Sequence, residues 1–212
     1  MTQLFRRRAE KVILDIGCGR NPWMLRSRAE GFAKCIGIDP EVEPLCDGNI
    51  TLMKGSAYAL PLADNSVDVV TSVNVLEHLE HPRKAFAECK RVLRPNGLLL
   101  LITPNKLFPP LFAAQSIPHQ LRQKLLKMLL GRDEDTVYPA YYRANTSRTL
   151  RKMLISTGFS VLSTEHVSEQ PIYFEFSATC YCLWTLFDRF CLRHKPFWRL
   201  RHYIVCKGAL AS

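Results

Sequence analysis

Residues 12–22 read Val-Ile-Leu-Asp-Ile-Gly-Cys-Gly-Arg-Asn-Pro. The aliphatic run before Gly17 predicts a strand that is buried on both faces, as inside a parallel sheet. Glycine tolerates a positive φ and leaves the backbone bare, so Gly17 and Gly19 suit a tight turn beneath a ligand. Pro22 is favoured at the first position of a helix. Strand, Gly-x-Gly turn and helix together predict the opening unit of a nucleotide-binding α/β fold.

Asp15 bears on which cofactor this turn holds. A dinucleotide places its pyrophosphate on the glycine turn, and a carboxylate there would repel it by several kcal/mol at ~4 Å if the effective dielectric is about 20. The third glycine of the dinucleotide fingerprint falls on Pro22. A cofactor with an ammonium group near the turn would instead be attracted by Asp15, and S-adenosylmethionine (SAM) has such a group.

The stretch resembles the first motif of the class I SAM-dependent methyltransferases, in particular the type 11 group with small-molecule and lipid acceptors. A purely structural βα turn is the alternative. Asp39 stands at the end of a second predicted strand, over residues 33–40. An acid at this place in a nucleotide-binding βαβ unit accepts hydrogen bonds from ribose hydroxyls, and the resemblance implies the same role here. A turn-forming Asp before Pro40 is the alternative.

Two more predicted strands, Ile50–Lys54 and Val67–Val73, end in family-like sequences. The resembled family usually has an acid at the position of Ser56, where it holds the adenine amino group, and a hydroxyl is a weaker, neutral acceptor. The fourth strand is followed by Asn74 and a Val-Leu-Glu-His turn similar to that of the family. The resemblance implies that the cofactor-binding residues are Asp15, Gly17, Cys18, Gly19, Asp39, Pro40, Ser56, Ala57 and Asn74.

Alternating strands and helices predict an α/β fold with a doubly wound, mostly parallel sheet. A helix is expected over residues 22–30 and another from Pro82 to about Leu93, whose Phe86, Cys89 and Val92 share a face; a turn at 94–97 then leads to a fifth strand at 98–102. The resemblance implies seven strands, helices on both faces and an antiparallel last strand, over 202–207. Ligands bind beyond the carboxyl ends of parallel strands, so the candidate residues should meet at one edge.

The pattern changes after residue 106. The chain fits one domain of 212 residues, with its core over 11–106, 145–168 and 202–207, and with insertions over 107–144 and 169–201 after the fifth and sixth strands. The second core segment is predicted as a helix capped at 145–147 and a strand over 159–167.

The two insertions have different compositions. The first contains a proline-broken apolar loop at Leu107–Phe112 and a basic amphipathic helix at Gln120–Gly131. The second is rich in aromatic residues over 173–190 and basic after that. We expect the insertions to form a lid over the acceptor; a dimer interface or an extension of the core is the alternative.

The net charge of +10 is uneven. Residues 1–106 hold 15 Lys and Arg against 12 Asp and Glu, whereas residues 107–212 hold 14 against 7, so the excess is +3 and +7. This suits a partner with negative charge, such as a phosphorylated or lipid-phosphate substrate, a membrane surface or RNA. Solvated surface charge is the alternative.

Cysteine usage and hydropathy indicate the setting. The eight cysteines show no C-x-x-C spacing, which favours reduced thiols over a disulfide framework or a zinc site, and we expect no metal. No run approaches the ~18 apolar residues of a membrane span, and no apolar segment of a signal peptide follows Arg6–Arg8. We expect a cytoplasmic protein with a peripheral contact to the membrane.

His78 is the candidate catalytic residue. Methyl transfer from a sulfonium is an in-line displacement, for which the enzyme mainly holds the acceptor ~3 Å from the methyl group. A base is needed only for a hydroxyl or an acidic carbon, and imidazole titrates near neutral pH. The alternative is that His78 packs or caps the next helix.

The expected function is SAM-dependent methyl transfer to a small or lipid-like, anionic acceptor. An RNA methyltransferase and a non-catalytic SAM-binding protein are the alternatives. A nucleic-acid partner is disfavoured, because the turn after the fourth strand lacks the Asn/Asp-Pro-Pro-aromatic signature and no separate RNA-binding module is evident. The sequence makes no prediction of the oligomeric state.

Overall fold

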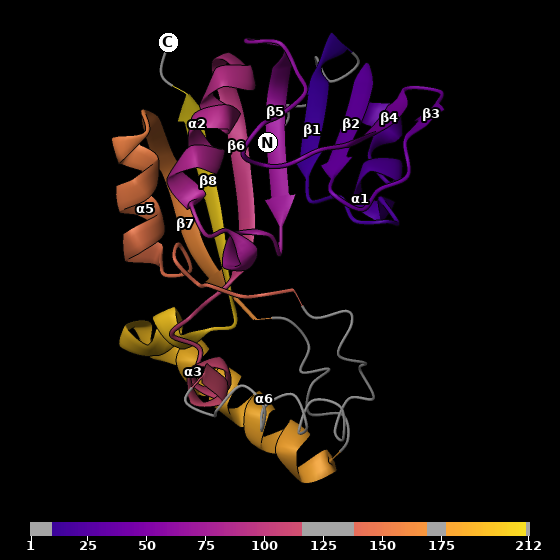
Figure 1. The fold of residues 1–212 in the computed structure, drawn as a ribbon. Helices are drawn as coiled ribbons and strands as arrows, with labels where there is room; N and C mark the ends of the chain where they lie inside the picture. The colour runs from indigo at the N-terminus through magenta and orange to yellow at the C-terminus, as the bar shows by residue number, and fades with distance from the viewer. Residues whose placement is uncertain (1–9, 116–137, 169–176, 211–212) are drawn as a thin grey trace.

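The computed structural model describes residues 10–115, 138–168 and 177–210 (Figure 1). In these residues the chain forms one sheet of eight strands, in the order β3-β4-β2-β1-β5-β6-β8-β7. The strands are β1 Val12–Ile16, β2 Lys34–Asp39, β3 Leu45–Asp47, β4 Ile50–Lys54, β5 Val67–Val73, β6 Leu93–Pro104, β7 Phe159–Val167 and β8 Tyr203–Leu210. The helices, with 3-10 helices marked η, are α1 Trp23–Arg26, η2 Ala29–Gly31, η3 Leu76–His78, α2 Pro82–Val92, α3 Pro109–Gln115, α5 Ser147–Ser156, α6 Ala178–Arg193 and η6 Lys195–Leu200.

Parallel strands form the centre of the sheet. β4, β2, β1, β5 and β6 run in one direction, with β1 between β2 and β5. β8 runs antiparallel to both β6 and β7, so the prediction of a mostly parallel sheet with an antiparallel last strand is confirmed. The predicted number of seven strands is one too few. The additional strand, β3, pairs antiparallel with β4, and its residues are all exposed, so no apolar pattern marks it in the sequence.

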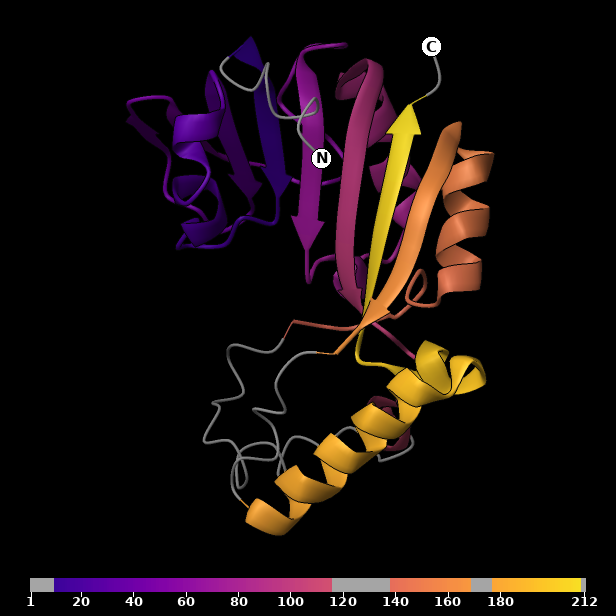
Figure 2. The ribbon, with the colours of Figure 1, turned by 180° about the vertical axis from the view of Figure 1, so that it is seen from behind.

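Successive side chains of β1 point to opposite faces of the sheet and enter different cores. Leu14 and Ile16 join the larger core, together with Phe86 of α2. Ile13 faces the other side and packs in a smaller core with Leu25 of α1. α2 and α5 cover one face (Figure 1) and α1 lies on the other (Figure 2), which confirms the helices on both faces.

Both long core helices agree with the sequence. α2 buries Phe86, Cys89 and Val92, the three residues predicted to share a face. α5 is capped by Thr146, whose hydroxyl accepts a hydrogen bond from Thr149 N at 3.2 Å. These two helices contact each other and pack into the same core on one face of the sheet.

The structure corrects three predicted boundaries. Residues 94–97, predicted as a turn before the fifth strand, lie inside β6, where Asn96 takes a φ of +63° and the register with β5 shifts. Leu107–Phe112, predicted as a loop, runs into helix α3, which begins at Pro109. Proline is tolerated there because the first N–H groups of a helix have no intrahelical acceptor. The helix predicted over 22–30 is divided into α1 and η2.

The described parts of the insertions lie beyond the end of the sheet at which β5 and β6 finish (Figures 1 and 2). Phe108, just before α3, contacts Trp184 of α6, with 4.9 Å between the ring centroids. The amphipathic helix predicted at Gln120–Gly131 lies outside the described residues. Within the described ranges, no helix is long and apolar enough to cross a membrane.

Candidate functional site

The turn after β1 is built on two glycines with positive φ angles, +74° at Gly17 and +65° at Gly19. Gly17 is also enclosed: its N–H donates to Ile38 O at 2.8 Å, and a Cβ built on it would lie 2.1 Å from Val75 Cγ2. A Cβ on Gly19 would meet no atom within 4 Å. The backbone conformation favours glycine at both positions, but only Gly17 is also required by packing.

Asp39, at the end of β2, is held by backbone N–H groups. Its Oδ2 accepts a hydrogen bond from Gly19 N at 3.0 Å, and its Oδ1 accepts one from Glu41 N at 2.8 Å. The carboxylate therefore ties the turn after β1 to the turn after β2. Each oxygen keeps a further lone pair, so the half-buried group can still accept hydrogen bonds from a ligand.

Asp15 lies behind the glycine turn. It is 3% exposed, and its Oδ1 accepts a hydrogen bond from Thr71 Oγ1 at 2.8 Å. Burial raises the pKa of this carboxyl to about 6, against the opposing effects of the Thr71 hydrogen bond and Arg28. The group is therefore mostly ionised at pH 7. Cys18 is also buried, and burial raises the pKa of its thiol to about 12.

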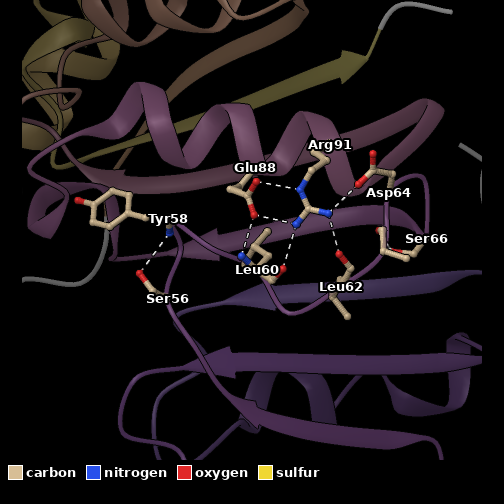
Figure 3. Close-up of polar contacts among 9 residues, drawn as sticks. Ser56, Tyr58, Leu60, Leu62, Asp64, Ser66, Glu88 and Arg91 are labelled. Carbon is tan, nitrogen blue, oxygen red and sulfur yellow. Dashed lines mark hydrogen bonds and ion pairs between the residues drawn. The ribbon is translucent and has the colours of Figure 1, made fainter.

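A single arginine of α2 holds the loop after β4 (Figure 3). Arg91 donates to the carbonyl oxygens of Leu60 at 2.9 Å and Leu62 at 2.7 Å. It also forms ion pairs, each at 2.8 Å, with Asp64 of the loop and Glu88 of its own helix. Glu88 in turn accepts a hydrogen bond from Leu60 N at 2.8 Å. The loop is thereby anchored to α2 at several points.

Ser56 and Ala57 precede this anchored part. The Ser56 hydroxyl accepts a hydrogen bond from Tyr58 N at 3.2 Å, which closes a local turn. Tyr58 is partly exposed, and its hydroxyl accepts a hydrogen bond from His81 N at 3.2 Å. The loop start is thus shaped by its own backbone and by the turn that precedes α2.

The turn after β5 presents Asn74 and His78. Asn74 adopts a φ of +56°. His78 Nδ1 lies 2.9 Å from Pro139 O, and its Nε2 lies 3.9 Å from Glu77 Oε1. Glu77 is buried and accepts a hydrogen bond from Thr103 Oγ1 at 3.2 Å. Burial raises the pKa of the Glu77 carboxyl.

Residues 138–142, from the end of the first insertion, lie against this turn. The N–H groups of Tyr141 and Tyr142 donate to Glu77 O at 2.6 Å and 3.1 Å. The position of this segment is therefore coupled to the backbone of η3.

Tyr138 connects the same segment to the turn after β2. Its ring meets the ring of His78 edge-on, with 5.8 Å between centroids. Its hydroxyl is hydrogen-bonded to Glu41 and lowers the pKa of that carboxyl. Glu41 also pairs with Arg20 at 3.1 Å.

These elements surround a cavity of about 680 Å³ at the carboxyl ends of β1, β2, β4 and β5. The predicted site residues that line it are Gly17, Gly19, Asp39, Pro40, Ser56, Ala57, Asn74 and His78. Asp15 and Cys18 are not among its lining residues. The charged and tyrosine lining residues that the sequence analysis missed are Arg20, Glu41, Tyr58 and Tyr138.

The missed residues differ in how visible they are in the sequence. Arg20 directly follows the Gly-x-Gly turn and Glu41 follows Asp39 by two residues, so proximity to motifs is a usable signal. Tyr138 is far from every motif, and only the fold brings it to the cavity.

The cavity fits a cofactor that combines a nucleoside with an amino-acid group. Its volume lies within the usual range for ligand sites, and a carboxylate stands at the ribose position at the end of β2. The open side of Gly19 leaves bare backbone at the cavity wall. The ionised Asp15 behind the turn disfavours a pyrophosphate there. In the described part of the chain, no group of three or more His, Cys, Asp or Glu side chains is placed to hold a metal ion. Fold and site together define a Rossmann-like domain of the SAM-binding kind.

Comparisons with known proteins agree with this class. Residues 14–101 match the family model described as a methyltransferase domain. A "probable S-adenosylmethionine-dependent methyltransferase" of Mycolicibacterium smegmatis is 30% identical over 168 residues, which are 76% of this chain and 57% of that protein. A tRNA U34 carboxymethyltransferase of Pseudoalteromonas translucida is 37% identical over 103 residues, 44% of this chain and 32% of that protein.

The fold has close counterparts among solved structures. The SAM-dependent methyltransferase from Mesorhizobium loti superposes with a TM-score of 0.63 at 18% identity, over 95% of this chain and 91% of that one. Residues 14–101 therefore belong to the methyltransferase domain family, and the fold is that of the class I SAM-dependent methyltransferases, whose cofactor is SAM. The chain spans only 57% and 32% of the length of the two curated relatives.

Proposed function

We propose that this chain transfers a methyl group from SAM to a small or lipid-like acceptor that carries an anionic group. The observation that carries the proposal is the cavity, where the glycine turn, Asp39 and His78 face one space. SAM, when bound, would supply a methyl group on a sulfonium: the acceptor's nucleophile attacks the methyl carbon in line, and the demethylated cofactor leaves as a neutral thioether. The work left to the protein is to bind, orient and shield the two reactants.

Three carboxyl or hydroxyl groups would hold the cofactor. Asp39 has lone pairs left to accept hydrogen bonds from the ribose hydroxyls. Ser56 offers a neutral acceptor near the adenine, weaker than the carboxylate usual in the family. Asp15 acts through the turn: its buried negative charge favours an ammonium group over a phosphate at Gly17 and Gly19.

In this proposal His78 would serve as a general base for an acceptor hydroxyl. A carbonyl only accepts hydrogen bonds, so the contact with Pro139 O puts the proton on Nδ1 and leaves a lone pair on Nε2. Nε2 would take the proton that the hydroxyl loses as it is methylated. The Glu77 carboxyl, 3.9 Å from Nε2, would then stabilise the charged imidazole.

Two features support a lipid-like, anionic acceptor. The excess of +7 in residues 107–212 suits an anionic group, and the wall of the cavity is apolar on one side. Val75, Leu79 and Tyr138 give the cavity an apolar side beside His78. The first insertion supplies Tyr138, and among the described residues the second insertion supplies none of the lining. We therefore place the lid in the first insertion, at residues 138–142.

Substitution of His78 tests the mechanism. We expect His78→Ala and His78→Gln to lower kcat by about 10²–10⁴-fold for a hydroxyl acceptor while the Kd for SAM changes little. His81→Ala, in the next turn and exposed, is the matched control and should retain activity. Full activity in both His78 variants would show that this side chain only packs against the segment at Pro139.

Binding and turnover separate the alternatives. Calorimetry should show SAM and its demethylated product binding, with no binding of NADH or a flavin dinucleotide. Release of demethylated cofactor with lipid-like anionic acceptors, and not with RNA, supports the proposal. The relative that is a tRNA carboxymethyltransferase makes RNA the second candidate, for which methylation of RNA and steeply salt-dependent binding would be expected. SAM binding without turnover on any acceptor would indicate a binding protein.

A further inference from the structure

Among the described residues, the contacts that anchor helix α6 lie on one side of it. Trp184 and Cys191 are buried, and Trp184 packs against Phe108. Asp188 is paired with Arg201, whose Nε lies 3.4 Å from its Oδ1. These contacts hold the inner face of α6 against the segments that follow β6 and precede β8. The opposite face of α6 is turned outward.

The outer face is apolar. Leu183 and Leu186 are each 62% exposed, and Phe190 and Phe197 are 43% and 42% exposed. The first three follow one another at helical spacings of three and four residues, so they share a face of α6. Phe197 of η6 extends that face, with 5.0 Å between its ring centroid and that of Phe190. We call these four residues the apolar patch.

Four cations of α6 and η6 accompany the apolar patch. Arg189, Arg193, Lys195 and Arg199 are all exposed, and among the described residues none of them is in an ion pair. The only acid between residues 178 and 201 is Asp188, which is already paired with Arg201. The helix therefore combines exposed leucine and phenylalanine side chains with uncompensated positive charge.

We propose that α6 and η6 dock on an anionic lipid surface, with the apolar patch inserted at the interface and the four cations against the headgroups. Apolar residues beside Lys and Arg are the signature of an interfacial helix, and the cations complement anionic lipids. α6 lies beyond the end of the sheet at which β5 and the cavity turns finish (Figures 1 and 2). Docking would bring that end toward the lipid. The proposal does not depend on methyl transfer.

Two other occupants fit less well. A two-fold interface between copies would set the cations of one copy near the same cations of the other, without acids to compensate. RNA would satisfy the cations and could stack on Phe190 and Phe197, but the most exposed side chains of the patch, Leu183 and Leu186, offer no stacking surface for bases. Both remain as measurable outcomes of the test.

Flotation with vesicles tests the proposal on the full chain without SAM. The protein should float with vesicles of equal parts phosphatidylcholine and phosphatidylglycerol, and much less with phosphatidylcholine alone or at high salt. Each basic residue near the surface contributes about fivefold, so Arg189→Gln with Arg193→Gln should weaken partitioning roughly 25-fold. Leu186→Ser with Phe190→Ser should weaken it by about tenfold or more.

Matched controls lie on α5, where Arg148, Lys152 and Ile155 are exposed. Arg148→Gln with Lys152→Gln, and Ile155→Ser, should partition as the unmodified chain does, and thermal unfolding checks that all variants are folded. Equal flotation of the α6 and α5 variants overturns the proposal. So does a dimer, by light scattering, that Leu186→Ser dissociates while no vesicle is bound, or salt-sensitive binding to RNA alone.

Discussion

Replacing each glycine of the first turn by alanine should give two different failures. At Gly17 the positive φ costs an alanine about 1–2 kcal/mol, and the Cβ would stand 2.1 Å from Val75 Cγ2. Forcing a methyl group into a packed site costs about 1–3 kcal/mol more. Gly17→Ala should therefore lose about 2–5 kcal/mol of unfolding free energy. At about 2–4 °C per kcal/mol, this corresponds to a fall in Tm of roughly 4–20 °C.

At Gly19 only the backbone term applies, because a Cβ would meet no atom within 4 Å. Gly19→Ala should lose about 1–2 kcal/mol. Its methyl group would project from the wall of the cavity, so the variant should fold and yet bind SAM more weakly. In Gly17→Ala the loss of unfolding free energy should be the larger effect, and the loss of affinity for SAM the smaller one.

Urea unfolding without cofactor, followed by calorimetry with SAM, distinguishes these outcomes. A third variant isolates the clash: Val75→Ala removes the methyl group that the Gly17 substitution would meet, so the double variant should recover at least about 1 kcal/mol beyond additivity. Equal losses of stability in the two glycine variants, with no coupling to Val75, would refute the reasoning.

Three further predictions concern charged groups. The pKa of Asp15 is about 6 in the fold against 3.8 ordinarily, so the folded state binds the proton more tightly than the unfolded state does. The free energy of unfolding should therefore fall, by up to about 3 kcal/mol, as pH rises from about 4 to 6. Urea unfolding at a series of pH values should show this slope in the unmodified chain and not in Asp15→Asn. SAM, as a cation near Asp15, should lower that pKa, so calorimetry in two buffers should show proton release on binding below pH 7. Arg91→Lys keeps the charge but loses the forked contacts to Glu88 and the loop carbonyls, and thermal melts should show a loss of about 1–3 kcal/mol, with a lower affinity for SAM.

The parallel core could be predicted because β1, β2 and β4 are largely apolar runs that end at a glycine or an acid, and β5 and β6 carry apolar residues in family-like order. The predicted bounds of Ile50–Lys54 and Val67–Val73 agree with β4 and β5 to the residue. Strand β3 has no such run, since all its residues are exposed. The prolines in residues 107–112 predict a loop, yet Pro109 begins α3, because the first N–H groups of a helix have no intrahelical acceptor.

The candidate site could be predicted where chain order places it. Asp39 and Asn74 follow strands that any parallel sheet brings to one edge, and both line the cavity. Tyr138 reaches the cavity by a contact with Glu41, nearly a hundred residues earlier, which no local pattern encodes. Charge and the family motif predict Asp15 beside the cofactor, but its side chain is buried and bonded to Thr71, and it does not line the cavity.

Most of the cavity-lining residues and the two insertions follow different strands of the sheet. Apart from Tyr138, the residues that line the cavity lie at the ends of β1, β2, β4 and β5 or in the turns after them, whereas both insertions leave from β6 and β7 and return through α5 and β8. The family match stops at residue 101, inside β6, where this division falls. The segments proposed to hold the acceptor therefore leave from β6 and β7, so an exchange of these segments would, among the described residues, alter the turns after β1, β2, β4 and β5 mainly where residues 138–142 contact them.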